Sequence, residues 1–277
     1  MEKLNLGISI SSVSPRMNWQ LIKLLAESEI RTFELNAYMF SEDFDGALAN
    51  AFMKALRSKG KRVNSYHIPF TPLDDISAID ESVRLRAMAR FRAQIRTARF
   101  FEAELLVVHP STEPIEQDKR HLHMTQLRKS LLELEPELRL EGLRLTLENL
   151  PRLCMGNSVT ELKTMLAGLN PLFGACLDVN HLMSHWQNLP AYVEDLGQLL
   201  YTLHISDYDG VDEKHWLPGQ GVIDWKNFLL ALRKNNYQGT FNYEVKINHE
   251  LDLPGRLEEI NDNFASLCAL GGFPLVP

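Results

Sequence analysis

Four apolar segments in the C-terminal half of the chain each end on a residue that can ligate a metal ion. The segments are LTLEN, GACLDVNH, TLHISD and FNYEV, and the residues in question are Glu148, Asp178, His204 and Glu244. Three carboxylates and one imidazole suit Mn²⁺, Zn²⁺, Fe²⁺ or Mg²⁺ and leave coordination positions for substrate oxygens. Taken singly, each could equally be a hydrogen-bonded polar residue at the end of a buried strand. Together they predict a divalent-metal site that acts on a small, oxygen-rich substrate.

Further histidines are placed where they could complete or line that site. His67 in SYHIPF and His109 in LVVHPS end two earlier apolar segments, so we expect them either to ligate a second metal ion or to contact a substrate hydroxyl. His181 follows Asp178 by three residues, which suits a direct ligand or a residue that orients the ligands and the substrate. His215 in DEKHWLPGQG belongs to a loop that could close over the metal. The alternatives are a structural histidine at 181 and a solvated loop histidine at 215.

Two more residues are candidates for binding the substrate, and one acidic residue is ambiguous. Arg152 in ENLPR could bind a phosphate or a carboxylate through two hydrogen bonds, or lie at the surface. Trp216 could stack on the apolar face of a sugar, or pack within a lid. Glu34 in TFELN ends a strand-like segment, and it either reaches the same site or forms a salt bridge to a neighbouring unit.

Eight strand-like segments alternate with eight helix-like segments along the chain. The strands are expected at 5–10, 31–36, 62–68, 104–109, 143–148, 173–178, 201–206 and 240–245, and the helices at 18–29, 46–59, 80–102, 118–140, 158–168, 190–199, 224–235 and 253–270. The strand segments are rich in Val, Ile, Leu, Phe and Tyr, mostly without alternation, as in strands buried on both faces. This pattern predicts an α/β chain that forms a single (β/α)8 barrel domain over residues 1–277. A doubly wound open sheet is disfavoured because no GxGxxG or P-loop follows the first strand.

Composition restricts the partners and the compartment. A formal net charge of −7 and a pI near 5.7 argue against nucleic acid, because such a surface repels phosphates. The three cysteines, Cys154, Cys176 and Cys268, have no CxxC spacing, which indicates reduced thiols. MEKLNLGISI is unlike a signal peptide, and no apolar run approaches the roughly 20 residues that span a bilayer. We therefore expect a cytoplasmic protein with a small-molecule partner and no membrane; the apolar segment GGFPLVP is compatible with a homodimer.

A set of motifs resembles one known superfamily. VVHP, LENLPR, LDVNH, HISD, HWLPGQG, IDW and NYEV together look like the xylose-isomerase-like barrels, which include sugar (phosphate) isomerases and epimerases and the endonuclease IV enzymes for abasic DNA. The resemblance runs from about residue 5 to residue 268. In the ketose 3-epimerase branch, it implies that Glu148, Asp178, His204 and Glu244 ligate one metal ion. It also implies that the two glutamates act as acid and base and that His181 contacts the substrate.

The chain departs from the epimerase branch at two positions and from the endonuclease branch at one. The arginine that the epimerases carry after the strand-seven histidine is absent, and their second glutamate falls on Cys154, which argues against a free-ketose 3-epimerase. The endonuclease branch implies three zinc ions, and its aspartate two residues before the loop histidine is replaced by Glu213. The other eight zinc ligands of that branch match His67, His109, Glu148, Asp178, His181, His204, His215 and Glu244. Acidic loops after strands three and seven argue against DNA.

The favoured function is a metal-dependent sugar or keto-polyol isomerase or epimerase that transfers a proton through an enediolate. Glu148 and Glu244 are the expected acid and base, and one Mn²⁺, Zn²⁺, Fe²⁺ or Mg²⁺ ion is the expected cofactor, with two or three Zn²⁺ ions as the alternative. The alternative functions are an abasic-site endonuclease, a metal-dependent dehydratase or lyase, and a barrel that binds a polyol without turning it over.

Overall fold

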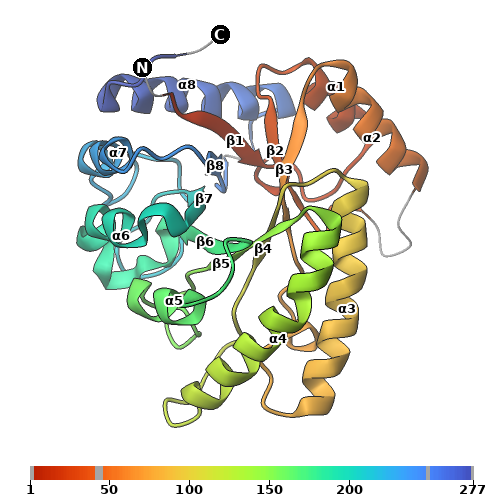
Figure 1. Ribbon diagram of the computed structural model, residues 1–277. Coiled ribbons are helices and arrows are strands. Elements are labelled where there is room, and N and C mark those ends of the chain that lie inside the picture. Colours follow the sequence, from red (N-terminus) through yellow and green to blue (C-terminus); the bar gives the residue numbers. More distant parts are fainter. Residues whose placement is uncertain (1–2, 41–45, 248–249, 276–277) are drawn as a thin grey trace.

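The eight expected strands form one closed parallel barrel. The computed structural model describes residues 3–40, 46–247 and 250–275 (Figure 1). The strands are β1 (Asn5–Ser9), β2 (Thr32–Asn36), β3 (Arg62–His67), β4 (Leu105–Val108), β5 (Arg144–Glu148), β6 (Phe173–Asp178), β7 (Leu200–Ile205) and β8 (Thr240–Tyr243). They pair in sequence order, and β1 also pairs with β8, so the sheet has no free edge. The predicted (β/α)8 barrel is therefore confirmed.

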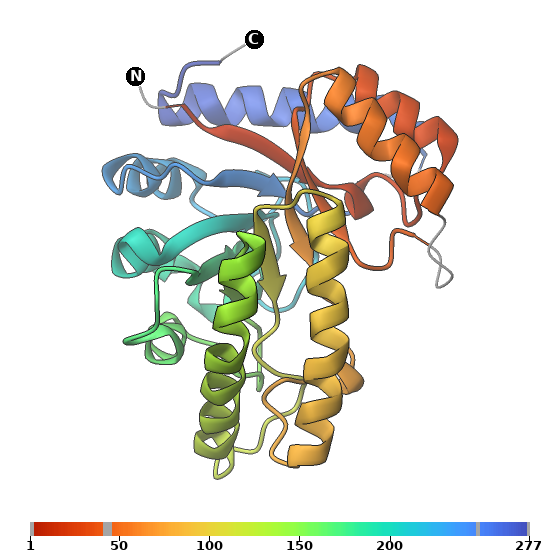
Figure 2. The same ribbon diagram turned by 45° about the vertical axis from the view of Figure 1, so that its right-hand side comes forward.

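Eight helices cover the outside of the barrel. They are α1 (Trp19–Glu27), α2 (Gly46–Ser58), α3 (Glu81–Phe100), α4 (Arg120–Glu141), α5 (Val159–Leu166), α6 (Leu189–Leu196), α7 (Trp225–Lys234) and α8 (Leu253–Gly271). The two longest, α3 and α4, run side by side and extend past the barrel (Figures 1 and 2). Within the described ranges, no helix is both long enough and apolar enough to cross a membrane.

Most of the strands alternate in polarity, with the apolar β4 as an exception, so the expected lack of alternation is wrong; the expected burial on both faces is confirmed. In β7 and β8, Leu203 pairs with Phe241, whose ring contacts Phe228 of α7 and Phe264 of α8, so this pair faces the helices. His204 pairs with Asn242 and, by the period of two, faces the barrel interior. The other buried polar residues at strand positions include Ser9, Glu34, Ser65, Thr146 and Thr202. The hydrophobic core therefore lies between strands and helices, and the barrel interior is available for polar chemistry.

The element ends agree with the sequence patterns to within two residues, with one exception. Helix α6 ends at Leu196 instead of residue 199, because Gly197 has a positive φ of 53° that stops the helix and starts a short 3₁₀ turn. The 3₁₀ segment Val179–Asn188, which directly follows β6, was not predicted from the sequence. This segment places His181 against the end of β5, where its imidazole meets the backbone of Asn149.

Candidate metal centre

The four residues predicted as metal ligands meet at the C-terminal end of the barrel. Glu148 and Asp178 are the last residues of β5 and β6, His204 is next to last in β7, and Glu244 directly follows β8. We call these residues the strand cluster. One side-chain ligand atom from each lies within 4.8 Å of the others, as four ligands of one ion require.

His204 is the centre of the strand cluster. Its Nδ1 lies 3.1 Å from Oε1 of Glu148, 3.0 Å from Oε2 of Glu244 and 3.8 Å from Oδ2 of Asp178. The side chains of Glu148 and Asp178 are 1% exposed, whereas that of Glu244 is 24% exposed. Oδ2 of Asp178 is buried and has no hydrogen-bond partner among the described residues. A buried carboxylate oxygen without a partner, beside two further carboxylates and an imidazole nitrogen, is a donor set that fits a divalent cation.

The charges of the strand cluster are strongly coupled. Burial disfavours the charged form of His204, but the negative charges of Glu34, Glu244 and Glu148 outweigh it and raise its pKa well above the usual value. Burial likewise opposes ionisation of Glu244, yet the charge and hydrogen bond of His204 lower its pKa to about 2. Burial raises the pKa of Asp178. The surrounding carboxylates therefore favour the positively charged form of His204.

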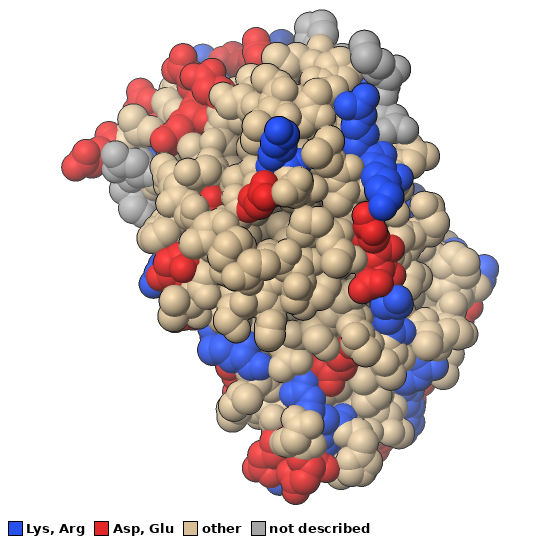
Figure 3. Space-filling view, turned by 90° about the vertical axis from the view of Figure 1, so that its left-hand side faces the viewer, with Lys and Arg blue, Asp and Glu red and all other residues tan. Residues whose placement is uncertain are grey.

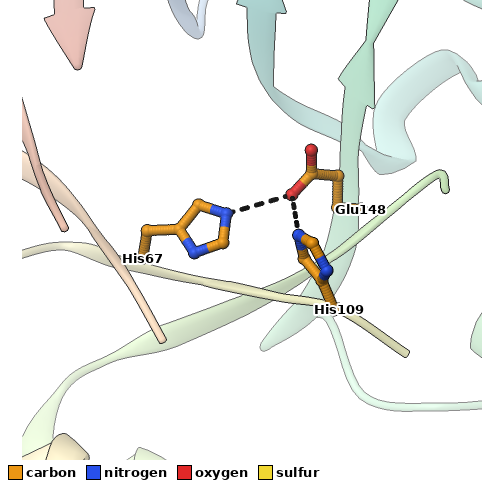
Figure 4. A group of neighbouring side chains, drawn as sticks. All are labelled: His67, His109 and Glu148. Atoms are coloured by element: carbon orange, nitrogen blue, oxygen red, sulfur yellow. Dashed lines mark hydrogen bonds and ion pairs between the residues drawn. The ribbon is translucent and has the colours of Figure 1, made fainter. Parts of the chain in front are cut away.

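A second group of ligand-type residues adjoins the strand cluster at Glu148. Nε2 of His67 and Nε2 of His109 each lie 3.3 Å from Oε2 of Glu148 (Figure 4). His67 ends β3 and His109 directly follows β4, so both come from strand ends, as expected. Nδ1 of His67 is held by the backbone oxygen of Ile68, 3.0 Å away. We call His67, His109 and Glu148 the rim group; its three ligand atoms also lie within 4.8 Å of one another.

A third group comes from the segments after β6 and β7. Nε2 of His181 lies 3.7 Å and Nε2 of His215 lies 3.9 Å from Oε2 of Glu213. Nδ1 of each imidazole faces a backbone oxygen, that of Asn149 at 2.9 Å for His181 and that of Glu244 at 3.1 Å for His215. We call His181, Glu213 and His215 the loop group. The sequence identified Glu213 only as a replaced aspartate; its spacing of two residues from His215 was the available signal.

Arg152 and Trp216 lie in the loops of the same rim. The Arg152 guanidinium pairs with Glu113 at 3.0 Å, Asp212 at 3.1 Å and Glu213 at 2.6 Å, so it joins the loop after β5 to the loop after β7. Trp216 exchanges two backbone hydrogen bonds of 2.8 Å with Asp207, which closes the base of the loop after β7. Direct contact of either residue with a substrate stays a prediction.

Glu34 is the residue whose place the sequence left open. It is fully buried inside the barrel, and its Oε2 lies 3.1 Å from Nε2 of His204. Both expectations hold in part: Glu34 contacts a residue of the strand cluster, and it does so as an ion pair with another unit, although that unit, β7, is not a neighbour of β2. The strand end alone could not decide this, because β2 and β7 lie far apart in the sequence and only closure of the barrel brings them together.

Comparisons with known proteins agree with this architecture. A family model described as "Xylose isomerase-like TIM barrel" matches residues 22–267. An uncharacterized protein of Methanocaldococcus jannaschii, MJ1614, is 27% identical over 187 residues, which are 68% of this chain and 72% of that protein.

Three solved structures share the fold over nearly all of the chain. A D-tagatose 3-epimerase-like protein has a TM-score of 0.80 at 21% identity, and the superposition covers 97% of this chain and 99% of that one. A D-psicose 3-epimerase solved in the presence of D-fructose has a TM-score of 0.81 at 17% identity, with 97% and 100% covered. An IolI protein with a bound zinc atom has a TM-score of 0.82 at 14% identity, with both chains fully covered. At these identities the likeness establishes the fold.

Proposed function

The chain belongs to the xylose isomerase-like TIM barrel family, and from that premise we propose that it is a divalent-metal-dependent sugar or keto-polyol isomerase or epimerase. The observation that carries the proposal is the strand cluster, in which three carboxylates and Nδ1 of His204 converge within 4.8 Å. The epimerases among the structurally similar proteins support the substrate class.

The strand cluster would hold the ion through Glu148, Asp178, His204 and Glu244. An ion bound there would supply Lewis acidity to a carbonyl and an adjacent hydroxyl of the open-chain substrate. Mn²⁺, Fe²⁺, Mg²⁺ and Zn²⁺ all suit the mixed carboxylate and imidazole set, and the zinc of the IolI structure makes Zn²⁺ the first ion to test.

We propose Glu244 as the base that removes the proton from the substrate carbon. It is the most accessible carboxylate of the strand cluster, and its low pKa of about 2 keeps it ionised. Its carboxylate removes the proton from the hydroxyl-bearing carbon, and the electron pair moves into the neighbouring carbonyl to give an enediolate. Glu148 takes up a proton from solvent before the reaction, and it delivers that proton to the opposite face in epimerisation or to the neighbouring carbon in isomerisation; Glu244 then releases the proton that it removed to solvent. His67 and His109, which contact Glu148, are proposed to bind substrate hydroxyls.

The loop after β5 argues against epimerisation of a free ketose at carbon 3. Cys154 occupies the position of the second glutamate of the ketose 3-epimerases, and it is buried, with a pKa raised by burial to about 12. Its neutral thiol cannot replace a carboxylate that accepts hydrogen bonds from sugar hydroxyls. We therefore propose a substrate that differs from a free ketose in the part that this loop contacts.

A three-metal phosphodiesterase of the endonuclease type is the second candidate function. The observation that favours it is that the rim group, strand cluster and loop group adjoin one another, so the chain offers three sets of ligands. The acidic loop after β7 opposes DNA less than its composition suggests, because Asp207 is buried, Asp209 pairs with Lys214, and Arg152 pairs with the two other acids. On the one face of the molecule shown in Figure 3, basic and acidic side chains are interspersed.

Isotope exchange separates the two candidates. The protein, loaded in turn with Zn²⁺, Mn²⁺, Fe²⁺ and Mg²⁺, is incubated in D₂O with a panel of free and phosphorylated ketoses and keto-polyols, and deuterium at carbon is followed by NMR. The proposal predicts metal-dependent deuterium incorporation into at least one sugar, and loss of incorporation in Glu244→Gln. Cleavage of an abasic oligonucleotide by the zinc-loaded protein, with no exchange in any sugar, would instead establish the second candidate.

A further inference from the structure

The histidines of the site differ in how their second ring nitrogen is held. His67, His181 and His215 each turn Nδ1 toward a backbone oxygen, at 3.0, 2.9 and 3.1 Å, and turn Nε2 toward a carboxylate of the site. His204 is reversed. Its Nδ1 faces the carboxylates of the strand cluster, and its Nε2 faces away from them, into the barrel. The partner of Nε2 is the carboxylate of Glu34, at 3.1 Å, instead of a backbone oxygen.

The contact between Glu34 and His204 is sealed inside the barrel. Both residues are fully buried, and they come from strands β2 and β7. Oε2 of Glu34 also accepts a hydrogen bond of 2.8 Å from the Ser65 hydroxyl on the adjacent strand β3, which fixes the carboxylate in place. The ring of His67 lies beside that of His204 at 5.7 Å with an interplanar angle of 19°, so the imidazole is also confined from one face.

We infer that Glu34 is a positioning residue for the metal site: its carboxylate accepts a hydrogen bond from Nε2–H of His204 and thereby presents the Nδ1 lone pair to the ion. The inference deepens the proposed function and rests on it. An ionised carboxylate only accepts hydrogen bonds, so the tautomer that it favours carries the proton on Nε2 and leaves Nδ1 free for a metal. The same contact fixes the rotation of the ring, as carboxylate–histidine–metal triads do elsewhere.

A purely structural role for Glu34 makes different predictions. A buried carboxylate that only tied β2 to β3 and β7 would affect folding stability and leave metal affinity unchanged in any variant that folds. Oε1 of Glu34 has no hydrogen-bond partner among the described residues, so half of the carboxylate is buried without compensation. Burying an oxygen without a partner lowers the folding stability. The position of the carboxylate is therefore better explained by the contact of its other oxygen, Oε2, with His204.

Zinc affinity of matched variants tests the inference. The variant is Glu34→Gln, which keeps the shape of the side chain and removes its charge. Ser65→Ala, which removes the other hydrogen bond to the same oxygen, should have a smaller effect in the same direction. The matched control is Asp75→Asn, which neutralises a buried carboxylate in the loop after β3 that accepts hydrogen bonds from Ser77 and Thr112. The dissociation constant is measured by competition with a chromogenic zinc chelator, and folding is monitored by circular dichroism and Tm.

We expect Glu34→Gln to weaken zinc binding by about 10- to 100-fold, the range for partners of metal-ligating histidines, and the control Asp75→Asn to stay near wild type. If Glu34→Gln does not fold, Glu34→Asp replaces it; this variant keeps the charge but shortens the side chain, and the same direction of change is expected. A folded variant at position 34 with wild-type zinc affinity would overturn the role of Glu34 and leave the metal site itself standing. A wild-type protein that binds no zinc would overturn the metal site and, with it, the role of Glu34.

A spectroscopic signature separates positioning from a general loosening of the site. In zinc-loaded protein with ¹⁵N-labelled histidine, we expect His204 to show a slowly exchanging, downfield Nε2–H proton and an Nδ1 nitrogen without a proton. Glu34→Gln should shift or remove that proton signal, whereas Asp75→Asn should keep it. A signal from Nδ1–H in the zinc-loaded wild-type protein would contradict the inference directly.

Discussion

Two neighbouring ligand sets in this barrel are built in different ways. In the strand cluster, Glu148, Asp178 and His204 lie within strands and Glu244 directly follows one, so the barrel ladder fixes their backbones. In the loop group, His181 comes from a 3₁₀ segment, and Glu213 and His215 come from the loop after β7. The Glu213 side chain is 26% exposed, against 1% for Glu148.

The loop group depends on a few polar contacts in place of a strand ladder. Arg152 holds Glu213, and the Asn180 side-chain oxygen accepts from the backbone N–H groups of Lys214 and His215 at 3.2 and 3.4 Å. The backbones of the strand cluster are thus held by the barrel itself, and we expect that the loop group can be disrupted without loss of the fold. This difference predicts that single substitutions separate the two sets.

The largest effect is expected from a substitution in the strand cluster. Glu244→Gln and Glu148→Gln each remove a charged ligand, so metal affinity should fall by more than about 100-fold, beyond the loss expected for a residue that only supports a ligand. Most turnover should be lost with it. The matched control is Glu104→Gln, whose carboxylate pairs with exposed Arg62 instead of the site. Competition titrations with zinc give the affinities; a wild-type value in either site variant would show that these carboxylates do not bind the ion.

A smaller and more selective effect is expected in the loop group. If the wild-type protein binds more than one zinc ion at saturation, Glu213→Gln should lower that number by one; in either case the ion of the strand cluster should stay in place, because its ligands belong to the strands. Asp212→Asn is the matched control, since Asp212 pairs with the same Arg152 but lies outside the loop group. Elemental analysis after gel filtration measures the count. Loss of all bound metal in Glu213→Gln would mean that the two sets are a single cooperative site.

The rim group should make the folding stability of the metal-free protein depend on pH. Burial works against the charged form of His67, but the hydrogen bond and charge of Glu148 outweigh it and raise the pKa from 6.5 to about 8. The folded state therefore binds this proton more tightly than the unfolded state, so the stabilisation is complete below pH 6.5 and is lost as the pH rises through 8. The lost stabilisation amounts to roughly 1–2 kcal/mol of unfolding free energy. The difference in Tm between wild type and His67→Gln should therefore shrink by a few degrees over this pH interval. A constant difference would exclude the His67–Glu148 ion pair.

The smallest effect on stability is expected at Arg152. Its side chain is 44% exposed, and exposed ion pairs contribute little, so Arg152→Met should change Tm by no more than a few degrees. The loop after β7 should nevertheless exchange its amide hydrogens faster, since Arg152 joins it to the loop after β5. Hydrogen exchange of residues 209–216 measures this, with β7 as the internal reference. Unchanged exchange in Arg152→Met would show that the loop group does not need the arginine.

The ligand-type residues at the strand ends could be predicted from the sequence. Apolar segments that end on carboxylates or imidazoles are visible as local patterns, and barrel closure brings such ends together without further information, which is why Glu148, Asp178, His204 and Glu244 could be grouped correctly.

What depends on side-chain direction or on contacts across the barrel could not be predicted in this way. The inward row of polar residues was missed because the strands were read by composition instead of by alternation. Glu34 meets His204 only after closure, and Glu213 depends on the path of a loop that Arg152 holds. The number of ligand groups at the rim is thus a property of tertiary structure.

The central claim is that the strand cluster holds a divalent ion. The direct test is elemental analysis of the purified wild-type protein after loading with Zn²⁺ or Mn²⁺ and removal of the excess by gel filtration. The account predicts at least one tightly held ion per chain, which a chelator removes and reloading restores. A folded protein that retains no divalent ion after loading would contradict it.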